Sequence, residues 1–575
     1  MASKDRHINF ALMRDRILAG QDGDGKQYWR SLEELADTAE FRDLVEREFP
    51  QAAEEWDDPI ERRTFLKLMG ASLALAGLSA CTYQPPEKIV PYVTQPEEIV
   101  PGKALFFATA MQLGGGSTGL LAKSNEGRPT KLEGNPDHPG SRGATDVFAQ
   151  ASLLDLYDPD RSQTLTFREE IRPWSNFLED IGRAMTAARA RGGAGLRFLT
   201  ETIMSPTLAA QLKAILTEMP QARLHQYEPA GRDGARAGAM LAFGQAVNTI
   251  YRFDQADRIF SIDSDFLACG PGSLAYAADF ANRRRVVGSQ RDMNRLYAVE
   301  TTLTNTGAKA DHRLALRPSE VEGFVRAVAR ALGVQAGAGG QAPGAGAHAN
   351  WIGALARDLQ QSRGRSIVIA GDEQSAVVHA LAHAMNDALG NTGKTVVYTD
   401  PLEAFPEDQM QSLRQLVADM NAGQVETLVI LGGNPVYNAP ADLSFGESLK
   451  KVALRVRLSV YKDETSELCH WHIPEAHYLE SWSDTRAHDG TATIIQPLIA
   501  PLYGGRTAHE LLAVFSPQSD RASYDILRSY WQGQMRSGGA GGAGAQAAGS
   551  VGQPAAVPPA GQGSSAGAAT GAGAA

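Results

Sequence analysis

The chain has 575 residues, of which 43% are hydrophobic and 21% are charged, and its formal net charge is −11. At roughly 100–200 residues per domain, this length predicts three or four domains with a large buried core. This negative net charge argues against a positively charged surface of the kind that binds nucleic acid.

Three cysteines, Cys81, Cys269 and Cys469, lie far apart in the sequence. Because no CxxC occurs, the spacing excludes a zinc ribbon, a thioredoxin motif, a locally ligated iron–sulfur cluster and a disulfide framework. We expect Cys269 and Cys469 to be buried free thiols. A single bridge between them in an oxidising compartment is the alternative.

Residues 1–61 are expected to form a helical, acidic leader. Twelve Asp and Glu side chains stand against two Arg between residues 31 and 61, and apolar residues recur at helical spacing from Tyr28 to Phe49. Such a segment is typical of a recognition tail or an amphipathic helix.

Residues 62–81 have the pattern of a twin-arginine export signal. Arg62 and Arg63 precede an apolar run from Leu68 to Ala80, which is too short to span a bilayer as a helix. The run ends at Cys81 in a sequence that resembles a bacterial lipobox, so we expect a lipid on that thiol. A short buried helix with an incidental arginine pair is the alternative.

The rest of the chain is expected to be α/β. Residues 82–102 are a Pro-rich extended linker, and residues 103–170 form a small β module. Two α/β domains follow, at 171–334 and 349–536, joined by a flexible loop at 335–348. The tail at 537–575 has 12 Gly and 14 Ala and should be disordered.

Short apolar runs beside helical stretches predict parallel sheets built from βαβ units. The expected strands are Leu196–Leu199, Arg258–Ile262, Leu296–Val299, Ser366–Ala370, Thr395–Tyr398, Thr427–Leu431 and Leu454–Val460. The expected helices are Thr207–Glu218, Glu320–Ala331, Ala376–Leu389 and Gln409–Met420.

One motif carries a family resemblance. The sequence GRPTKLEGNPDHP runs from Gly127 to Pro139 and is followed by LYDPDR from Leu156 to Arg161. By themselves these residues predict only tight corners between short strands. Their order resembles the first domain of the molybdopterin oxidoreductases, where a small β module binds a four-iron cluster and leads into the cofactor domains.

The departures from that family concern the cluster. The resemblance implies three cysteines just before the GRP segment, but Thr109–Gly119 contains none, and the fourth position falls near Asp146. Since this type of cluster needs thiolate ligands, we expect it to be absent. The glycines at 114–116 lack the spacing of a phosphate loop.

Two strand-end loops correspond to cofactor loops of the family. One contains Gly270 and Gly272, and the other contains Gly432, Gly433 and Asn434. Open α/β sheets bind ligands at the carboxyl ends of their strands, so these loops are predicted to be vestigial cofactor-binding loops. Plain strand–helix turns are the alternative.

Histidines cluster near the end of the chain. His470 and His472 are candidate metal ligands because residues i and i+2 of a strand share a face, and Glu475, Glu480 and Asp484 follow them. The resemblance favours a structural role instead. We assign no catalytic residue and no metal site from the sequence.

Three further segments resemble one group within the family. These are NRLYAVE at 294–300, GAKADHRL at 307–314 and RPSE at 317–320. They resemble the molybdopterin-like half of the large periplasmic B subunit of alternative complex III, a variant-Tat-translocated protein.

The resemblance implies a non-catalytic structural subunit of a membrane-bound quinol:electron-acceptor oxidoreductase in respiratory or photosynthetic electron transfer. It implies a lipid-anchored chain, exported by Tat, on the periplasmic face of the bacterial inner membrane. The implied partners are a ferredoxin-like iron–sulfur subunit or domain, c-type cytochromes with haem and polytopic quinol-binding subunits. The chain itself would hold no cofactor besides the lipid.

Two other functions stay open. One is a catalytic molybdenum or tungsten oxidoreductase of the polysulfide or tetrathionate reductase type, with a bis-molybdopterin guanine dinucleotide cofactor. The other is an exported ligand-binding lipoprotein. In both, export by the segment at 62–81 is retained.

Overall fold

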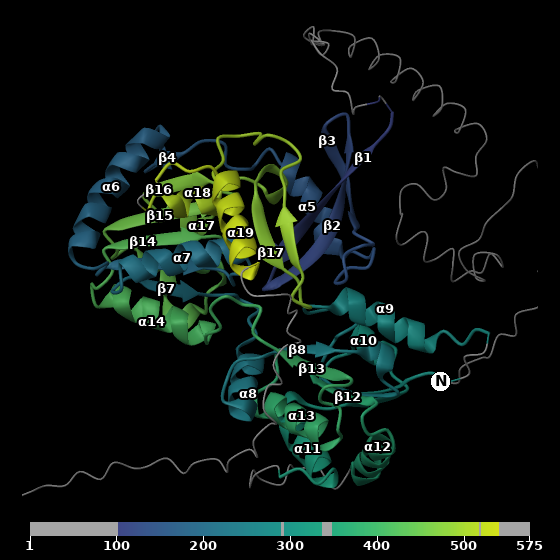
Figure 1. Ribbon diagram of the computed structural model, residues 1–575. Helices are drawn as coiled ribbons and strands as arrows, with labels where there is room; N and C mark the ends of the chain where they lie inside the picture. Colours follow the sequence, from purple (N-terminus) through teal and green to yellow (C-terminus); the bar gives the residue numbers. More distant parts are fainter. Residues whose placement is uncertain (1–99, 101, 289–291, 336–347, 517–518, 540–575) are drawn as a thin grey trace, which may run out of the picture. The chain divides into compact units, whose positions relative to one another are not determined.

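The computed structural model describes residues 100–539, except residues 101, 289–291, 336–347 and 517–518 (Figure 1). All of these residues belong to one compact unit. The leader, the twin-arginine segment, Cys81 and nearly all of the linker, the 335–348 loop and the tail lie outside the described residues. No helix within the described part of the chain has the length and apolar character needed to cross a membrane.

A three-stranded antiparallel sheet contains β1 (Leu105–Leu113), β2 (Gly116–Asn125) and β3 (Arg128–Gly134). Two-residue turns at Gly114–Gly115 and Glu126–Gly127 connect the strands, and all four residues have positive φ angles. Turns of this kind match the twist of hairpin strands. The 114–116 glycines therefore serve a hairpin, and α5 (Val147–Tyr157) packs on β3.

A seven-stranded sheet has the order β5-β4-β16-β15-β14-β6-β7. Its parallel strands are β6 (Leu196–Thr200), β7 (Arg223–Gln226), β14 (Thr427–Leu431), β15 (Leu454–Ser459) and β16 (Trp471–Pro474). The short β4 (Thr166–Phe167) and β5 (Glu170–Ile171) add an antiparallel edge. The helices α6 (Trp174–Ala190), α7 (Pro206–Glu218), α14 (Gln409–Asn421), α16 (Phe445–Leu449) and α18 (Ala508–Ala513) contribute to the cores around the sheet.

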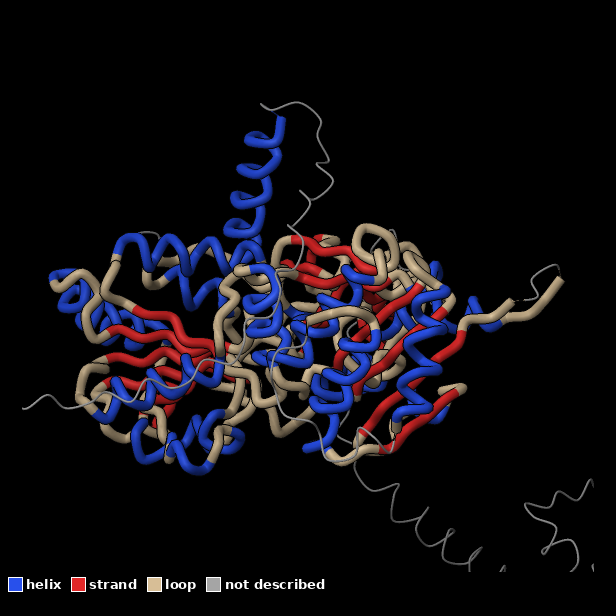
Figure 2. The backbone as a smooth tube through the Cα atoms, turned by 90° about the horizontal axis from the view of Figure 1, so that it is seen from below, coloured by secondary structure: helices blue, strands red, loops and turns tan. Residues whose placement is uncertain are grey.

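A four-stranded parallel sheet has the order β11-β10-β9-β12. Its strands are β9 (Arg258–Ile262), β10 (Arg295–Glu300), β11 (His312–Ala315) and β12 (Ser366–Ala370). The helices α9 (Ser273–Arg284), α11 (Pro318–Ala331), α12 (Ala349–Gln361) and α13 (Ala376–Ala388) pack against it. Figure 2 shows strands lying between helices, the arrangement in which strands are near-continuous apolar runs.

The remaining elements connect these sheets. Two antiparallel pairs join β8 (Asn248–Tyr251) to β13 (Val396–Thr399) and β17 (Ser483–Arg486) to β18 (Ala492–Ile495). The other helices are α8 (Asp233–Phe243), α10 (Asn305–Ala308), α15 (Pro435–Asn438), α17 (Glu464–Glu467) and α19 (Ser523–Gly539), with short 3-10 turns at Phe253–Gln255, Ala441–Leu443 and Tyr478–Glu480.

Every strand and helix expected between Leu196 and Val460 is present, and no end is shifted by more than two residues. The strand expected at Thr395–Tyr398 is β13, which pairs antiparallel with β8 and does not join a parallel sheet. The tail expected from Ser537 begins later, because α19 continues to Gly539.

The strand pairing divides the chain differently from the expected consecutive domains at 171–334 and 349–536. Strands β6 and β7 share their sheet with β14 to β16, while β9 to β12, which lie between them in the sequence, form the four-stranded sheet. The second sheet is therefore inserted into the first. Local patterns group neighbouring elements, whereas β6 and β14 are paired across more than two hundred residues.

Candidate site at the carboxyl ends of the parallel strands

Acidic side chains collect at one edge of the seven-stranded sheet. Glu201 directly follows β6, Glu475 directly follows β16, and Glu228 lies two residues beyond β7. The predicted loop Gly432–Asn434 follows β14 at the same edge. Because parallel strands point the same way, their carboxyl ends meet at one edge of the sheet, where open α/β sheets bind ligands.

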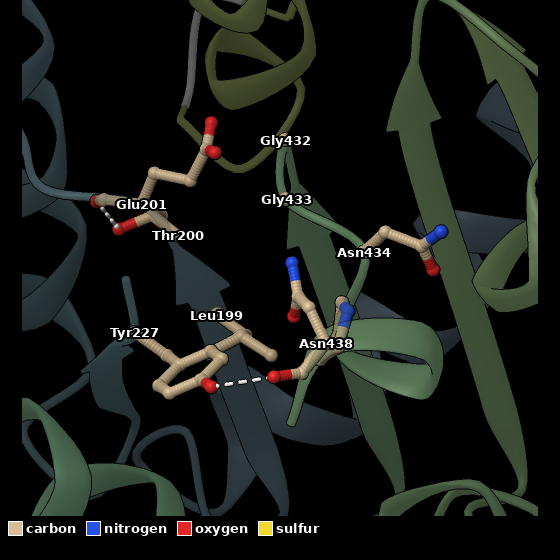
Figure 3. Close-up of a pocket in the computed structure, with 9 residues that line it drawn as sticks. Leu199, Thr200, Glu201, Tyr227, Gly432, Gly433, Asn434 and Asn438 are labelled. Carbon is tan, nitrogen blue, oxygen red and sulfur yellow. Dashed lines mark hydrogen bonds between the residues drawn. The ribbon is translucent and has the colours of Figure 1, made fainter. Parts of the chain in front are cut away.

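The Gly432–Gly433 loop closes around Glu201 (Figure 3). Both glycines have positive φ, 69° and 64°, and the backbone of Gly433 opposes the rise that burial causes in the pKa of Glu201. A Cβ on Gly432 would lie 2.6 Å from Oε2 of Glu201. Glycine is therefore favoured at 432 by the left-handed backbone conformation, and a larger residue there would also displace the Glu201 carboxylate.

Arg457, on β15, supplies the cation of this edge. Its side chain is 1% exposed and lies 2.6 Å from a carboxylate oxygen of Asp463. Its guanidinium also donates to the carbonyl oxygens of Gly432 and Gly433. The carbonyls of the loop are thus bound by the protein's own arginine.

The carboxyl groups at this edge hold their protons more tightly than usual. Burial and the nearby Glu201 raise the pKa of Glu475 to about 7, although Arg457 opposes the shift. Burial and Glu201 likewise raise the pKa of Glu228 to about 7, against the hydrogen bond from the Thr202 backbone. Burial also raises the pKa of Glu201. Each shift follows from removing a carboxylate from water and placing it near another one.

The hollow beside the loop is small. It has a volume of about 10 Å³, which is room for about one water molecule. Asn438 lines this hollow, and its buried Oδ1 has no hydrogen-bond partner among the described residues. A water molecule in the hollow could donate a hydrogen bond to this oxygen. The lining residues are Leu199, Thr200, Glu201, Tyr227, Gly432, Gly433, Asn434, Pro435 and Asn438 (Figure 3).

The second predicted loop lies at the carboxyl end of β9 and is also acidic. Gly270 and Gly272 have φ angles of 84° and 86°, and Gly272 begins α9. Asp265 accepts from the backbone and hydroxyl of Thr306 at 2.8 Å, and Asp372 lies 3.7 Å from a Cβ built on Gly270.

Cys269 is exposed in this loop, which corrects the expectation that it is buried, because the loop lies at the surface end of the strand. Partial burial and the carboxylates of Asp265 and Asp372 raise the pKa of its thiol. Cys469 is a free, half-buried thiol. No disulfide links the two cysteines in the part of the chain that the structure describes.

The residues present do not fit a bis-molybdopterin guanine dinucleotide. Its pyrophosphates need cations or free backbone N–H groups. At the β6–β14 edge Arg457 already binds two carbonyls and Asp463, and the Glu201 carboxylate lies against the glycine loop. An anionic ligand would meet carboxylates at both strand edges.

The region where the resemblance implies cluster cysteines is an ordinary hairpin. Thr109–Gly119 forms the facing ends of β1 and β2, which pair through Leu113 and Gly116. Asp146, at the fourth position, is the N-cap of α5 and accepts from the backbone of Ala149 at 2.7 Å. Asp146 therefore stabilises the start of α5, which is a structural role.

The histidines His470 and His472 do not converge. His470 accepts from the backbone of Arg455 and contacts its guanidinium at 3.0 Å, while His472 Nε2 lies 2.6 Å from the Ser162 hydroxyl. Burial lowers the pKa of each to about 4. Within the described residues, no group of three or more His, Cys, Asp or Glu side chains is arranged to hold a metal ion.

Three residues of this edge, Glu201, Glu228 and Arg457, were not singled out by the sequence pattern. Glu201 could have been found from the sequence, because it is an acidic residue within two residues of the end of the strand expected at Leu196–Leu199. No sequence signal identified Arg457. It lies in the middle of an apolar strand, and the sequence does not show which face of the sheet its side chain occupies.

We expect Glu475→Gln to raise the free energy of unfolding by about 1–3 kcal/mol at pH 8. The folded-state pKa of about 7 exceeds the value near 4.3 of an unfolded glutamate, so the folded chain binds more protons and stability falls as pH rises between them. Urea unfolding at pH 5 and pH 8 measures this, and the gain should be smaller at pH 5.

The matched control is Glu426→Gln. The hydrogen bond from Arg191 lowers the pKa of that carboxyl, so neutralising it should give no stabilisation at pH 8. A Glu475→Gln variant that is less stable at both pH values would contradict the raised pKa.

The fold defines a class of protein. Acetylene hydratase from Pelobacter acetylenicus has a solved structure that matches with a TM-score of 0.51 and 12% identity, over 72% of this chain and 68% of that one. None of the protein-family models compared with the chain matches it. The chain therefore shares an α/β fold with acetylene hydratase over most of its length.

A relative of established description agrees with this class. The chain is 23% identical over 502 residues to the molybdopterin-binding-like subunit of menaquinone reductase from Nitratidesulfovibrio vulgaris, covering 79% of this chain and 71% of the relative. The chain is therefore similar to a molybdopterin-binding-like subunit over most of its length, in agreement with the resemblance carried by the motif at 127–161.

Proposed function

We propose that the chain is a non-catalytic structural subunit of a membrane-bound quinol:electron-acceptor oxidoreductase of the alternative complex III type. The observation that carries this proposal is the acidic strand edge. There Glu201 lies against the Gly432–Gly433 loop and Arg457 binds its carbonyl oxygens, so these groups are not free to bind a cofactor. The cysteine-free hairpin at β1–β2 supports it, because electrons would have no cluster through which to leave.

The link to quinone rests on the relative, whose description is that of a menaquinone reductase subunit. On this proposal the redox groups belong to partners: a ferredoxin-like iron–sulfur protein, c-type cytochromes and a polytopic quinol-binding subunit. The twin arginines and Cys81 would place the chain, lipid-anchored, on the periplasmic face of the inner membrane.

A second candidate is a catalytic molybdenum or tungsten enzyme. The fold match to acetylene hydratase over most of both chains favours it. The carboxylates at both strand edges oppose it, because an anionic dinucleotide would have to displace or protonate them.

Elemental analysis of the natively extracted protein decides between these candidates. We expect iron to follow the partner subunits and the separated chain to hold no molybdenum, tungsten or iron. Stoichiometric molybdenum or tungsten on the separated chain would make it an enzyme. The absence of quinol oxidation from the intact extracted complex would instead overturn the quinone assignment.

A further inference from the structure

Two arginines at the amino-terminal edge of the seven-stranded sheet have no acidic partner. Arg455 is the second residue of β15, and Arg168 lies in the turn between β4 and β5. Among the residues that the structure describes, no Asp or Glu forms an ion pair with either side chain. Because β14, β15 and β16 are parallel, this edge lies opposite the acidic edge at their carboxyl ends.

His470, which directly precedes β16, joins the two arginines. The Arg168 backbone N–H donates to the His470 carbonyl at 2.8 Å, and the His470 backbone N–H donates to the Arg455 carbonyl at 3.0 Å. The Arg168 guanidinium lies 5.4 Å from the centre of the Phe167 ring, which stacks on the His470 ring at 6.4 Å. Burial lowers the pKa of Arg455, and the nearby positive charge of Arg168 lowers it further.

The His470 ring faces a donor at both of its nitrogens. The Arg455 backbone N lies 3.2 Å from Nδ1, and the Arg455 guanidinium lies 3.0 Å from Nε2. Burial, and then the charges of Arg455 and Arg168, lower the pKa of His470 to about 4, so the ring is neutral at pH 7. A neutral imidazole accepts at one nitrogen and carries a proton on the other, so in either tautomer one N–H faces a second donor.

Arg455 also has an unused donor. Its Nη1 donates to the carbonyls of Lys450 and Val452, just beyond α16, at 3.0 Å and 2.8 Å. Its buried Nε has no hydrogen-bond partner among the described residues. The cluster therefore has two cations and an excess of donors, and an anion would supply both the charge and the acceptors that it lacks.

The turn that carries Arg168 is built from unusual residues. Arg168 and Glu169 have φ angles of 48° and 72°. Two-residue hairpin turns with positive φ at both central positions favour Asn-Gly, so Arg168 is held in a strained backbone conformation. Arg168 is exposed at the tip of this turn, where its side chain is free to turn toward a ligand.

We propose that Arg168, Arg455 and His470 bind a phosphate group. Two guanidinium groups match the charge of a phosphate dianion, and phosphate oxygens accept hydrogen bonds from several donors at once. One phosphate oxygen accepts from both the His470 ring and the guanidinium that faces it. The phosphate is either free in solution or part of a lipid headgroup, and the site is independent of the proposed subunit role.

Equilibrium dialysis of the purified full chain against radiolabelled inorganic phosphate, at low ionic strength, tests the site. We expect one phosphate per chain and an affinity that falls at least tenfold in Arg168→Asn, because a hydrogen bond to a charged group is lost. Asparagine suits the positive φ of this turn, so the variant should fold, and circular dichroism checks that it does.

The matched control is Arg128→Asn. Arg128 is also exposed beside a hairpin turn, and no described Asp or Glu forms an ion pair with it. Its replacement should leave the phosphate affinity unchanged. Equal losses in the two variants would reduce the binding to general attraction by surface charge and would overturn the proposal.

The pKa of His470 shows where the phosphate binds. A nearby anion favours the imidazolium, so saturating phosphate should raise this pKa from about 4 toward its ordinary value. Nuclear magnetic resonance of the chain with ¹³C-labelled histidine rings measures it, with His470→Gln to identify the signal. Phosphate that binds without changing this pKa would lie elsewhere, which would overturn the proposal.

Vesicles distinguish the two sources of the phosphate. The chain is sedimented with phosphatidylcholine vesicles that contain or lack phosphatidic acid. Binding that needs phosphatidic acid and falls at least tenfold in Arg168→Asn but not in Arg128→Asn, without binding of free phosphate, would assign the site to a lipid headgroup. Binding of neither free phosphate nor phosphatidic acid would overturn the proposal.

Discussion

Replacing Glu480 with alanine is expected to lower the free energy of unfolding by about 3–5 kcal/mol, because it leaves a buried arginine without its partner. The Arg161 and Glu480 side chains are 2% and 1% exposed and lie 2.7 Å apart. Glu480 also accepts from the backbone of His477 and of Leu502 at 2.9 Å. Chemical unfolding followed by circular dichroism measures the loss.

This ion pair joins the small β module to the 3-10 turn Tyr478–Glu480, since Arg161 also donates to the Leu156 carbonyl near the end of α5. Glu170→Ala is the matched control, because its pair with Arg172 is exposed and should contribute less than about 1 kcal/mol. Similar losses for the two variants would contradict the assignment of a structural role to the buried pair.

The same pair predicts a pH dependence. Burial alone would raise the pKa of Glu480, but the hydrogen bonds from Arg161 and from two backbone N–H groups lower it below its usual value. Its contribution is therefore present above the unfolded pKa near 4.3 and is lost as pH falls below that value. Glu480→Gln should remove this part of the acid sensitivity.

Arg457→Met is expected to be destabilising by about 3–5 kcal/mol, because a buried charge network loses its cation. The carbonyls of Gly432 and Gly433 and the carboxylate of Asp463 would each lose a donor. The pKa values of Glu201 and Glu475 should rise further, since Arg457 is what opposes their shifts. The measurement is urea unfolding at pH 6 and pH 8, with a larger loss at pH 8.

A second substitution separates the charge from the packing. Glu475→Gln in the Arg457→Met chain should recover part of the loss, because one of the uncompensated carboxylates is removed. Arg223→Met is the control on the same sheet, since that arginine is 53% exposed and meets Asp419 at 3.4 Å. If Glu475→Gln gave no recovery, the two side chains would not be coupled.

Much of the secondary structure follows from local pattern. The run Thr427–Leu431 predicted β14 to the residue, because a strand buried on both faces must be a continuous apolar run. Ser205 and Pro206 place the start of α7, since serine caps a helix and proline fits its first turn. The two strand-end loops were likewise found from glycine after a strand.

The sequence alone determined the α/β class, the family resemblance and the loss of the cluster cysteines, because these depend on residue type, spacing and order. Only the tertiary structure decided that the four-stranded sheet is inserted into the seven-stranded one and that β13 is antiparallel. Only the tertiary structure also placed Glu201 near both Glu228 and Glu475, with Arg457 near Glu201 and Glu475. The physical reason is that a crossover between parallel strands can be very long, so residues hundreds of positions apart become neighbours at a sheet edge that no local pattern describes.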